Sequence, residues 1–294
     1  MSNSEATIVA TYSRRMRIRH ADDFFDARIK GKKLQPVCGD RVIAEPIANE
    51  TDWLITEILP RHNELSRPNM RGKVEILAAN IDVVIVVAAA RPAPDWFIVD
   101  RYLAAAENMA ADALVIFNKT DLAPADEQLA EYQRIGYETL SCSVADDINI
   151  AQIGAMVASR TAIMVGQSGV GKSSIINALI DGSQQRIGAI SEKSSEGRHT
   201  TVNSAMLELP GGGQIIDSPG VRDYAPALSD RNDVLRGFRE IAAAGQDCRF
   251  ANCRHLREPH CAVKNAVENG EISDRRYESY RRLLALTERL ETSG

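Results

Sequence analysis

Residues 161–174 have the sequence TAIMVGQSGVGKSS, an apolar run followed by the pattern Gly-x-x-x-x-Gly-Lys-Ser. The apolar run Thr161 to Val165 predicts a buried strand, and Ser173 to Ile180 predicts a helix. Glycines between a strand and a helix let backbone N–H groups face a phosphate at the helix N-terminus. The stretch therefore predicts a phosphate-binding loop carried by an open α/β sheet.

A second motif, Asn118-Lys119-Thr120-Asp121, follows the predicted strand Ala113 to Phe117. In open α/β sheets, ligands bind at the carboxyl ends of the strands. The carboxylate of Asp121 can accept hydrogen bonds from both N1–H and the exocyclic amine of guanine. Adenine lacks this pair of donors, so a site built for them rejects it. The motif predicts a guanine site.

The order of the two motifs is unusual, because the guanine motif precedes the phosphate loop. Ordinary GTPases have the phosphate loop first, and both motifs are intact in this chain. The order therefore predicts a circularly permuted P-loop domain.

The phosphate loop provides most of the expected contacts to GTP or GDP and Mg²⁺. Lys172 is expected to neutralise the β and γ phosphates and to assist catalysis, and Ser173 is expected to bind magnesium. The expected contacts of this loop are Gly166, Gln167, Ser168, Gly169, Val170, Gly171, Lys172, Ser173 and Ser174.

Two further segments are expected to reach the γ-phosphate and the metal. In Asp217-Ser218-Pro219-Gly220, a carboxylate at a strand end can hold Mg²⁺ through water while the Gly220 N–H meets the γ-phosphate. Residues 188–201 are polar and are expected to order around the triphosphate, with Thr200 or Thr201 completing the metal shell.

Three of the five cysteines gather near the C-terminal end as Cys248-x4-Cys253-x-His255-x5-Cys261. Three thiolates and one imidazole form a closed tetrahedral set that suits one structural Zn²⁺ ion and leaves no position for a catalytic water. His260 competes for the fourth position, but it adjoins Cys261, so His255 is favoured. A hydrolase acting at the zinc is a weaker alternative, which the closed set opposes.

The rest of the chain predicts an α/β core between two smaller domains. Residues 1–75 alternate short β-rich stretches with turns, which predicts a small antiparallel barrel, with an OB-type fold as the leading candidate and an SH3-like barrel as the alternative, and with Arg61 to Pro68 as linker. Residues 76–226 alternate strands and helices, as in a parallel sheet. Residues 227–294 predict helices, including Asp230 to Ala244, around the zinc cluster.

Composition limits the possible partners and compartments. The 294 residues are 44% hydrophobic, contain no apolar run long enough for a membrane span and begin without a secretory signal, which predicts a cytoplasmic protein. The net charge is −5, yet residues 1–41 hold nine Lys or Arg against five Asp or Glu. This local excess is either a solvated strand face or a phosphate-binding surface. Nothing in the sequence demands more than a monomer.

These motifs, in this order, resemble the circularly permuted ribosome biogenesis GTPases of the RsgA (YjeQ/YloQ) family. The resemblance extends over almost the whole chain and includes Gly39 to Val42 in the barrel region and Gly197-Arg198-His199-Thr200-Thr201. It implies an OB domain, a permuted GTPase and a zinc domain acting late in maturation of the small (30S) ribosomal subunit, which would bind through its rRNA and stimulate GTP hydrolysis.

The resemblance also implies further site residues. Ser141 and Cys142 would match a loop that supports guanine, although many GTPases carry alanine at the position of Cys142. Val221 stands where many GTPases place the glutamine that orients water, so His199 is the candidate for that task. The missing glutamine leaves one alternative, an RNA-binding adaptor that uses GTP as a structural ligand with negligible turnover.

Overall fold

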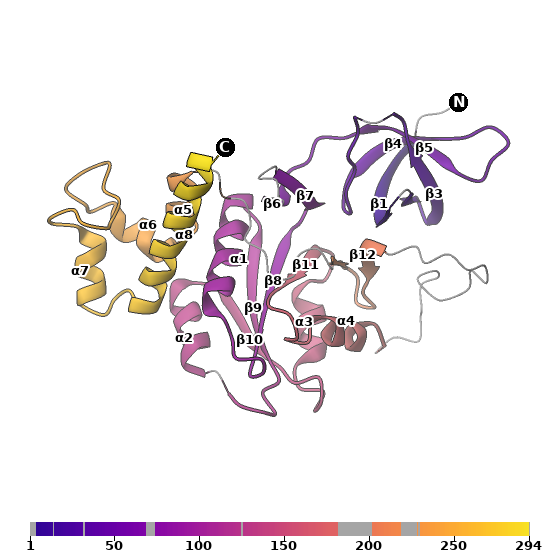
Figure 1. Ribbon diagram of the computed structural model, residues 1–294. Coiled ribbons are helices and arrows are strands. Elements are labelled where there is room, and N and C mark those ends of the chain that lie inside the picture. Colours follow the sequence, from indigo (N-terminus) through magenta and orange to yellow (C-terminus); the bar gives the residue numbers. More distant parts are fainter. Residues whose placement is uncertain are drawn as a thin grey trace.

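The computed structural model describes residues 4–13, 15–31, 33–68, 74–124, 126–181, 202–218, 228 and 230–293. A central α/β domain lies between an N-terminal barrel and a group of C-terminal helices, which occupy opposite sides of it (Figure 1). The sequence predictions for His199, Thr200, Thr201 and Gly220 fall outside the described residues. None of the helices in the described part combines the length and apolar character needed to cross a bilayer.

The N-terminal barrel consists of five strands, β1 (Ser4–Tyr12), β2 (Met16–His20), β3 (Asp23–Ile29), β4 (Arg41–Pro46) and β5 (Trp53–Ile58). The strand order is β1-β2-β3-β5-β4, and a β1–β4 pairing closes the barrel. The β3–β5 pair is parallel, whereas the other barrel pairs are antiparallel. Of the two barrel types predicted, this closed five-stranded Greek-key arrangement corresponds to the OB type.

The central domain contains the strands β8 (Val83–Ala89), β9 (Asp112–Asn118), β10 (Glu138–Ser141), β11 (Thr161–Val165), β12 (Val202–Glu208) and β13 (Gln214–Asp217). Their order is β10-β9-β8-β11-β13-β12, and all pairs are parallel except β12–β13. Every residue of β8 is buried, as expected for a central strand covered on both faces.

Helices cover both faces of this sheet. One face packs against α1 (Trp96–Met109) and α2 (Asp126–Ile135). The other face packs against α3 (Ile150–Met156) and α4 (Lys172–Asp181). The two hydrophobic clusters formed in this way hold the strand ends, and therefore the loops that follow them, in fixed positions.

The barrel is joined to the central domain by a shared sheet. β1 pairs antiparallel with β12, with Ala10 opposite Ala205 and Thr11 opposite Ser204, so that eleven strands form one continuous sheet. A hairpin of β6 (Glu64–Pro68) and β7 (Val74–Ala79) lies between the two domains in sequence. The segment predicted as a linker therefore contains a strand, and its Leu65 is buried in the same core as Val84.

The C-terminal domain consists of α5 (Arg231–Arg236), α6 (Arg239–Gly245), α7 (Ala262–Glu268) and α8 (Asp274–Ser293). The single helix predicted for Asp230 to Ala244 is two helices, because the backbone becomes extended at Phe238, between α5 and α6. A Cβ atom on Gly237 would lie 2.4 Å from the Cβ of Ala104 in α1, so only glycine permits this close contact. This contact packs the end of α5 closely against α1.

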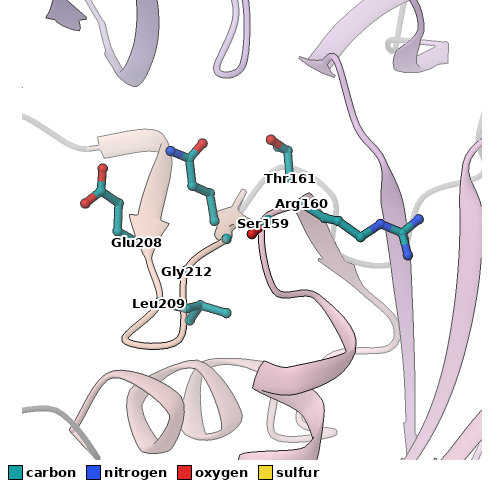
Figure 2. Close-up of a pocket in the computed structure, with 8 residues that line it drawn as sticks. Ser159, Arg160, Thr161, Glu208, Leu209 and Gly212 are labelled. Carbon is teal, nitrogen blue, oxygen red and sulfur yellow. The ribbon is translucent and has the colours of Figure 1, made fainter. Parts of the chain in front are cut away.

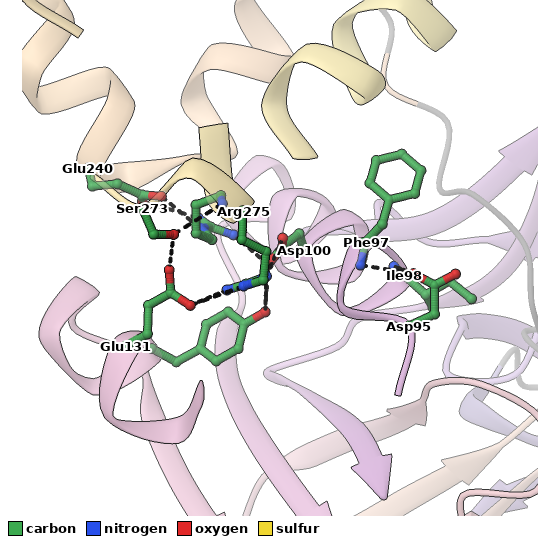
Figure 3. A network of polar contacts seen from close by, with 10 residues as sticks. Asp95, Phe97, Ile98, Asp100, Glu131, Glu240, Ser273 and Arg275 are labelled. Atoms are coloured by element: carbon green, nitrogen blue, oxygen red, sulfur yellow. Dashed lines mark hydrogen bonds and ion pairs between the residues drawn. The ribbon is translucent and has the colours of Figure 1, made fainter. Parts of the chain in front are cut away.

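A buried network of charged groups completes this contact (Figure 3). Asp100 of α1 has no exposed surface, and its carboxylate accepts hydrogen bonds from Tyr132 Oη at 2.6 Å and Arg276 Nη1 at 2.8 Å. Its second oxygen accepts from Arg275 Nη1 at 2.9 Å. Glu240 of α6 pairs with the other side of the Arg276 guanidinium at 2.7 Å. Residues from α1, α2, α6 and α8 thus share one polar cluster.

Candidate nucleotide site and metal cluster

The phosphate loop begins where β11 ends, and two of its glycines are required by close contacts with the neighbouring strands. Gly166 has a φ of +134°, and a Cβ atom there would lie 2.2 Å from the carbonyl oxygen of Val87 in β8. Gly171 has a φ of +96°, and a Cβ atom there would lie 2.4 Å from Asn118 Nδ2. Any larger residue at these positions would push the loop away from its neighbouring strands.

The lysine of the loop folds back over the loop backbone. Lys172, the first residue of α4, donates from Nζ to the carbonyl oxygens of Gly166 at 2.6 Å and Gln167 at 2.8 Å. The ammonium group is therefore held at the mouth of the loop and at the N-terminus of α4, where the helix dipole favours an anion.

The guanine motif lies against the phosphate loop, although the two are about fifty residues apart. Asn118, which is 1% exposed at the end of β9, donates from Nδ2 to the carbonyl oxygen of Val170 at 2.9 Å. Lys119 donates from Nζ to the carbonyl oxygens of Gly169 at 2.8 Å and Arg91 at 2.6 Å. These bonds fix the distance between the base-reading segment and the phosphate-binding segment.

The loop after β10 lies against the same motif. Thr120 donates from Oγ1 to the carbonyl oxygen of Cys142 at 3.0 Å, and the Cys142 thiol lies 3.5 Å from Asn118 Oδ1. Burial raises the pKa of Cys142 to about 12, so the thiol is neutral near pH 7. Ser141 is the last residue of β10, and its carbonyl oxygen accepts from Asn149 Nδ2 at 2.8 Å.

Sequence reasoning missed one residue of this region, Ser143. Its Oγ donates to Asp121 Oδ1 at 2.7 Å and thereby orients the carboxylate predicted to bind guanine. Its place in the sequence could have indicated this role, because Ser143 follows β10, and β10 lies next to β9, which ends in Asn118. Polar residues at the ends of neighbouring parallel strands meet at one edge of the sheet.

The predicted magnesium carboxylate, Asp217, ends β13 at this edge. β13 pairs in parallel with β11, with Ile163 opposite Ile216, so Asp217 lies near the start of the phosphate loop. The next residue, Ser218, is buried and its Oγ accepts a hydrogen bond from Ser204 Oγ at 2.9 Å.

The four predicted zinc ligands come together in the C-terminal domain. The ligand atoms of Cys248, Cys253, His255 and Cys261 all lie within 4.8 Å of one another. His255 Nδ1 lies 3.5 Å from the sulfurs of both Cys248 and Cys261, which are 3.9 Å apart. Tetrahedral Zn²⁺ with ordinary bond lengths requires edges of about 3.6 Å between nitrogen and sulfur and about 3.8 Å between sulfurs. The donor set therefore fits this ion.

The surroundings of the cluster are buried and positioned by backbone contacts. Burial raises the pKa of Cys253 to about 12, so its thiol would remain protonated without a cation. Partial burial acts to raise the pKa of Glu258, but the backbone N–H groups of Arg254, Leu256 and Arg257 lower it to about 2. The ionised Glu258 thereby orders the turn after His255. His260, the competing ligand in the sequence, is exposed and is not part of the cluster.

A separate hollow of about 310 Å³ lies at the opposite end of the strands (Figure 2). It is lined by Arg160 and Thr161 at the start of β11 and by Gln214 at the start of β13. Because nucleotides bind at the carboxyl ends of such strands, this hollow is separate from the nucleotide site.

The fold and the site geometry define a P-loop GTPase whose motifs are circularly permuted. Residues 58–226 match the family model described as RsgA GTPase. The chain therefore belongs to the RsgA GTPase family, and it is a GTP hydrolase that uses a guanine nucleotide and Mg²⁺.

Curated relatives and solved structures agree with this assignment. "Small ribosomal subunit biogenesis GTPase RsgA" of Azotobacter vinelandii is 42% identical over 85% of this chain and 74% of that protein. The protein of the same name from Haemophilus influenzae strain 86-028NP is 38% identical over 96% of this chain and 84% of that protein.

The crystal structure of YjeQ from Thermotoga maritima, 26% identical, has a TM-score of 0.76 over 97% of this chain and 99% of that chain. The structure of YloQ, titled a circularly permuted GTPase, is 24% identical, with a TM-score of 0.73 over 98% and 96% of the two chains. The predicted circular permutation and the three-part fold are confirmed.

Proposed function

We propose that this GTPase binds the small ribosomal subunit, assists or checks its late maturation, and hydrolyses GTP faster when the subunit is bound. The observation that carries the proposal is the direct contact between the two nucleotide motifs. Asn118 donates a hydrogen bond to the carbonyl oxygen of Val170, and Lys119 donates one to that of Gly169. The printed names of the relatives supply the ribosomal subunit as partner. The local excess of nine Lys or Arg over five Asp or Glu in residues 1–41 supports rRNA as the contact, in a monomeric protein of the cytoplasm.

The roles proposed for the site residues follow from their chemistry. Asp121, held by Ser143, accepts the guanine donors, while Asn118, Lys119 and Thr120 brace the loops around it. Ser141 and Cys142 belong to the loop that lies against this motif, and we propose that they support the guanine base.

The phosphate loop and the proposed magnesium ligands form the part of the site that binds the phosphates. Backbone N–H groups of residues 166–174 bind the phosphate oxygens, and Lys172 neutralises their charge. Mg²⁺, when bound, neutralises charge on the β and γ phosphates. Ser173, Asp217 and either Thr200 or Thr201 would hold it, and the Gly220 N–H would contact the γ-phosphate.

Phosphate release measured with and without purified small subunits tests the proposed function. We expect slow turnover by the protein alone and acceleration of at least tenfold by small subunits, with large subunits as the control. Equal rates in the three conditions would remove the subunit from the proposal and favour the adaptor that uses GTP as a structural ligand.

We propose His199 as the residue that orients the attacking water, because Val221 occupies the position of the usual glutamine. The variant His199→Ala is expected to bind GTP normally and to lose 100-fold or more of the subunit-stimulated rate, since such positioning contributes about 10²–10⁴-fold. His260→Ala, which alters a histidine of the C-terminal domain, is the control. Full stimulated turnover by His199→Ala would remove it from the mechanism.

We also propose that Cys248, Cys253, His255 and Cys261 bind one structural zinc ion. The cluster lies in the core of the C-terminal domain, beside Val263 and Tyr280. Cys253→Ala is therefore expected to lose the zinc and to expose α7 and α8 to amide hydrogen exchange, because metal binding and folding are coupled at such sites.

Zinc content by elemental mass spectrometry should be one ion per chain in the wild type and none in Cys253→Ala. Cys38→Ala is the matched control, since Cys38 is a buried thiol outside the cluster. A zinc-free wild type with the exchange pattern of the intact protein would contradict a structural role.

A further inference from the structure

A groove of about 580 Å³ runs between α1 of the GTPase domain and α8 of the C-terminal domain. On α1 its wall contains Phe97 and Arg101, which are one helical turn apart. On α8 its wall contains Arg281, Arg282 and Arg289. This groove lies outside the nucleotide site and the metal cluster.

Charge is concentrated in this groove, although the whole chain is acidic. Its walls hold four arginines and one acidic residue, Glu278, which gives a net charge of +3 in a protein whose overall charge is −5. Glu278 accepts hydrogen bonds from both Arg281 at 3.2 Å and Arg282 at 3.0 Å. One carboxylate therefore serves two guanidinium groups that are more than half exposed.

Arg101 is the least compensated cation of the groove. Its Nε atom is buried and has no hydrogen-bond partner among the described residues. Its guanidinium lies over the Phe97 ring, 5.3 Å from the centroid. Burial lowers the pKa of Arg101, which means that the surroundings disfavour the charged form. An anion bound in the groove would compensate the charge of this guanidinium.

The arrangement of the arginines on α8 indicates an extended anion. Residues 278, 281, 282, 285 and 289 follow each other at helical spacing and so form one stripe, while Arg276, Tyr280 and Leu283 face the core. From Arg281 to Arg289 the stripe extends for about 12 Å along the helix axis. Consecutive phosphates along a single strand lie about twice as far apart as the ~3.4 Å axial charge spacing of one duplex strand, so this length matches two or three phosphates.

We propose that the α1–α8 groove binds the sugar–phosphate backbone of RNA, with Arg101 on its wall and the Arg281, Arg282 and Arg289 stripe contacting successive phosphates. The choice of RNA over an acidic peptide rests on the proposed function, the action on a ribosomal subunit. Apolar residues between the arginines, including Leu256 and Ala285, suit the sugar edges of such a strand.

The groove also lies close to the phosphate loop. Asp95, the N-cap of α1 two residues before Phe97, donates its backbone N–H to Gln167 Oε1 of the phosphate loop at 3.3 Å. RNA bound to Phe97 and Arg101 would therefore lie close to the end of α1 that contacts the phosphate loop. Through this contact, bound RNA could change the rate of GTP hydrolysis.

The test compares the wild type with Arg281→Gln/Arg282→Gln and with the control Arg134→Gln/Arg236→Gln. Both pairs remove two positive charges, and Arg134 and Arg236 are outside the groove. The probes are fluorescein-labelled twelve-nucleotide poly(U) RNA, isolated small subunits and labelled polyglutamate. We expect the groove variant to bind both RNA probes at least tenfold more weakly at 0.1 M salt, and the control to bind like the wild type. The salt slope should fall by about 1.4, the contribution of two phosphate contacts.

A third variant, Arg101→Met, separates binding from folding. It is expected to weaken RNA binding without lowering Tm, because removing an uncompensated buried charge does not destabilise the fold. Unchanged RNA affinity of both groove variants would overturn the proposal, as would polyglutamate binding as tight as that of poly(U) with the same sensitivity to the groove variant.

The binding measurement with isolated small subunits tests the proposed function separately. Failure of the wild type to bind small subunits would overturn that function and, with it, the reason for choosing ribosomal RNA, while loss of poly(U) binding by the groove variant would still support the phosphate site. Basal GTP hydrolysis should be the same in all variants, since none of the altered residues belongs to the nucleotide site.

Discussion

Replacing Asp121 with alanine is expected to raise the Kd for GDP about 100-fold or more. The carboxylate is oriented by Ser143 Oγ at 2.7 Å, at the edge of the sheet where the base is expected to bind. Losing two hydrogen bonds from guanine to a charged acceptor costs about 3–4 kcal/mol, and each 1.4 kcal/mol is a factor of ten in affinity.

Isothermal titration calorimetry with GDP and ADP checks this expectation. The preference of the wild type for GDP over ADP should collapse in Asp121→Ala, while the weak ADP affinity stays unchanged. The control is Asp146→Ala, which removes a carboxylate that also faces Ser143, at 3.5 Å, but belongs to the following turn. Equal losses for GDP and ADP would show that Asp121 supports the loop rather than reading the base.

The second large effect is expected in stability. Asp100→Ala should lower the free energy of unfolding by about 3–5 kcal/mol, because it leaves Arg276, which is 1% exposed on its side chain, short of a buried negative partner. Burial would lower the pKa of Arg276, but the charges of Asp100 and Glu240 raise it well above its ordinary value. The native state therefore depends on these carboxylates.

Trp96 provides the measurement, because its ring lies 5.8 Å from the Arg275 guanidinium and 6.0 Å from the Tyr132 ring. The second tryptophan, Trp53, is in the barrel, so a Trp53→Phe background leaves one probe at this interface. Urea unfolding of Asp100→Ala is compared with that of Asp112→Ala, whose carboxylate is 74% exposed and pairs with Arg160. Exposed pairs contribute about 1 kcal/mol or less. Equal destabilisation would mean that the network does not hold the domains together.

Local patterns predicted much of the fold. The strand Thr161–Val165 occurs as predicted, and the helix after it begins one residue earlier, at Lys172. These elements were predictable because apolar periodicity and glycine positions are properties of short segments. The strand β3 was not predicted, although its residues Phe25 to Ile29 alternate apolar and polar side chains.

Long-range features could not be predicted in this way. Arg276 looks like one of many solvated arginines on a helix, yet it is buried by partners from α1 and α6 that are far away in sequence. The need for glycine at position 237 depends on its contact with Ala104, and the role of Ser143 depends on Asp121. Each of these requires knowledge of which surfaces meet, which single-segment patterns do not contain.

The pairing of β1 with β12 affects how the chain emerges from the ribosome that makes it. Residues 4–7 of β1 pair with β4 within the first 44 residues, but Ala10 and Thr11 must wait for Ala205 and Ser204. During synthesis this edge of β1 keeps unpaired N–H and C=O groups until more than two thirds of the chain exists, and such edges invite wrong pairings. The barrel can therefore close as soon as β5 has been made, whereas the edge of β1 that joins it to the nucleotide domain is paired only after β12 has been made.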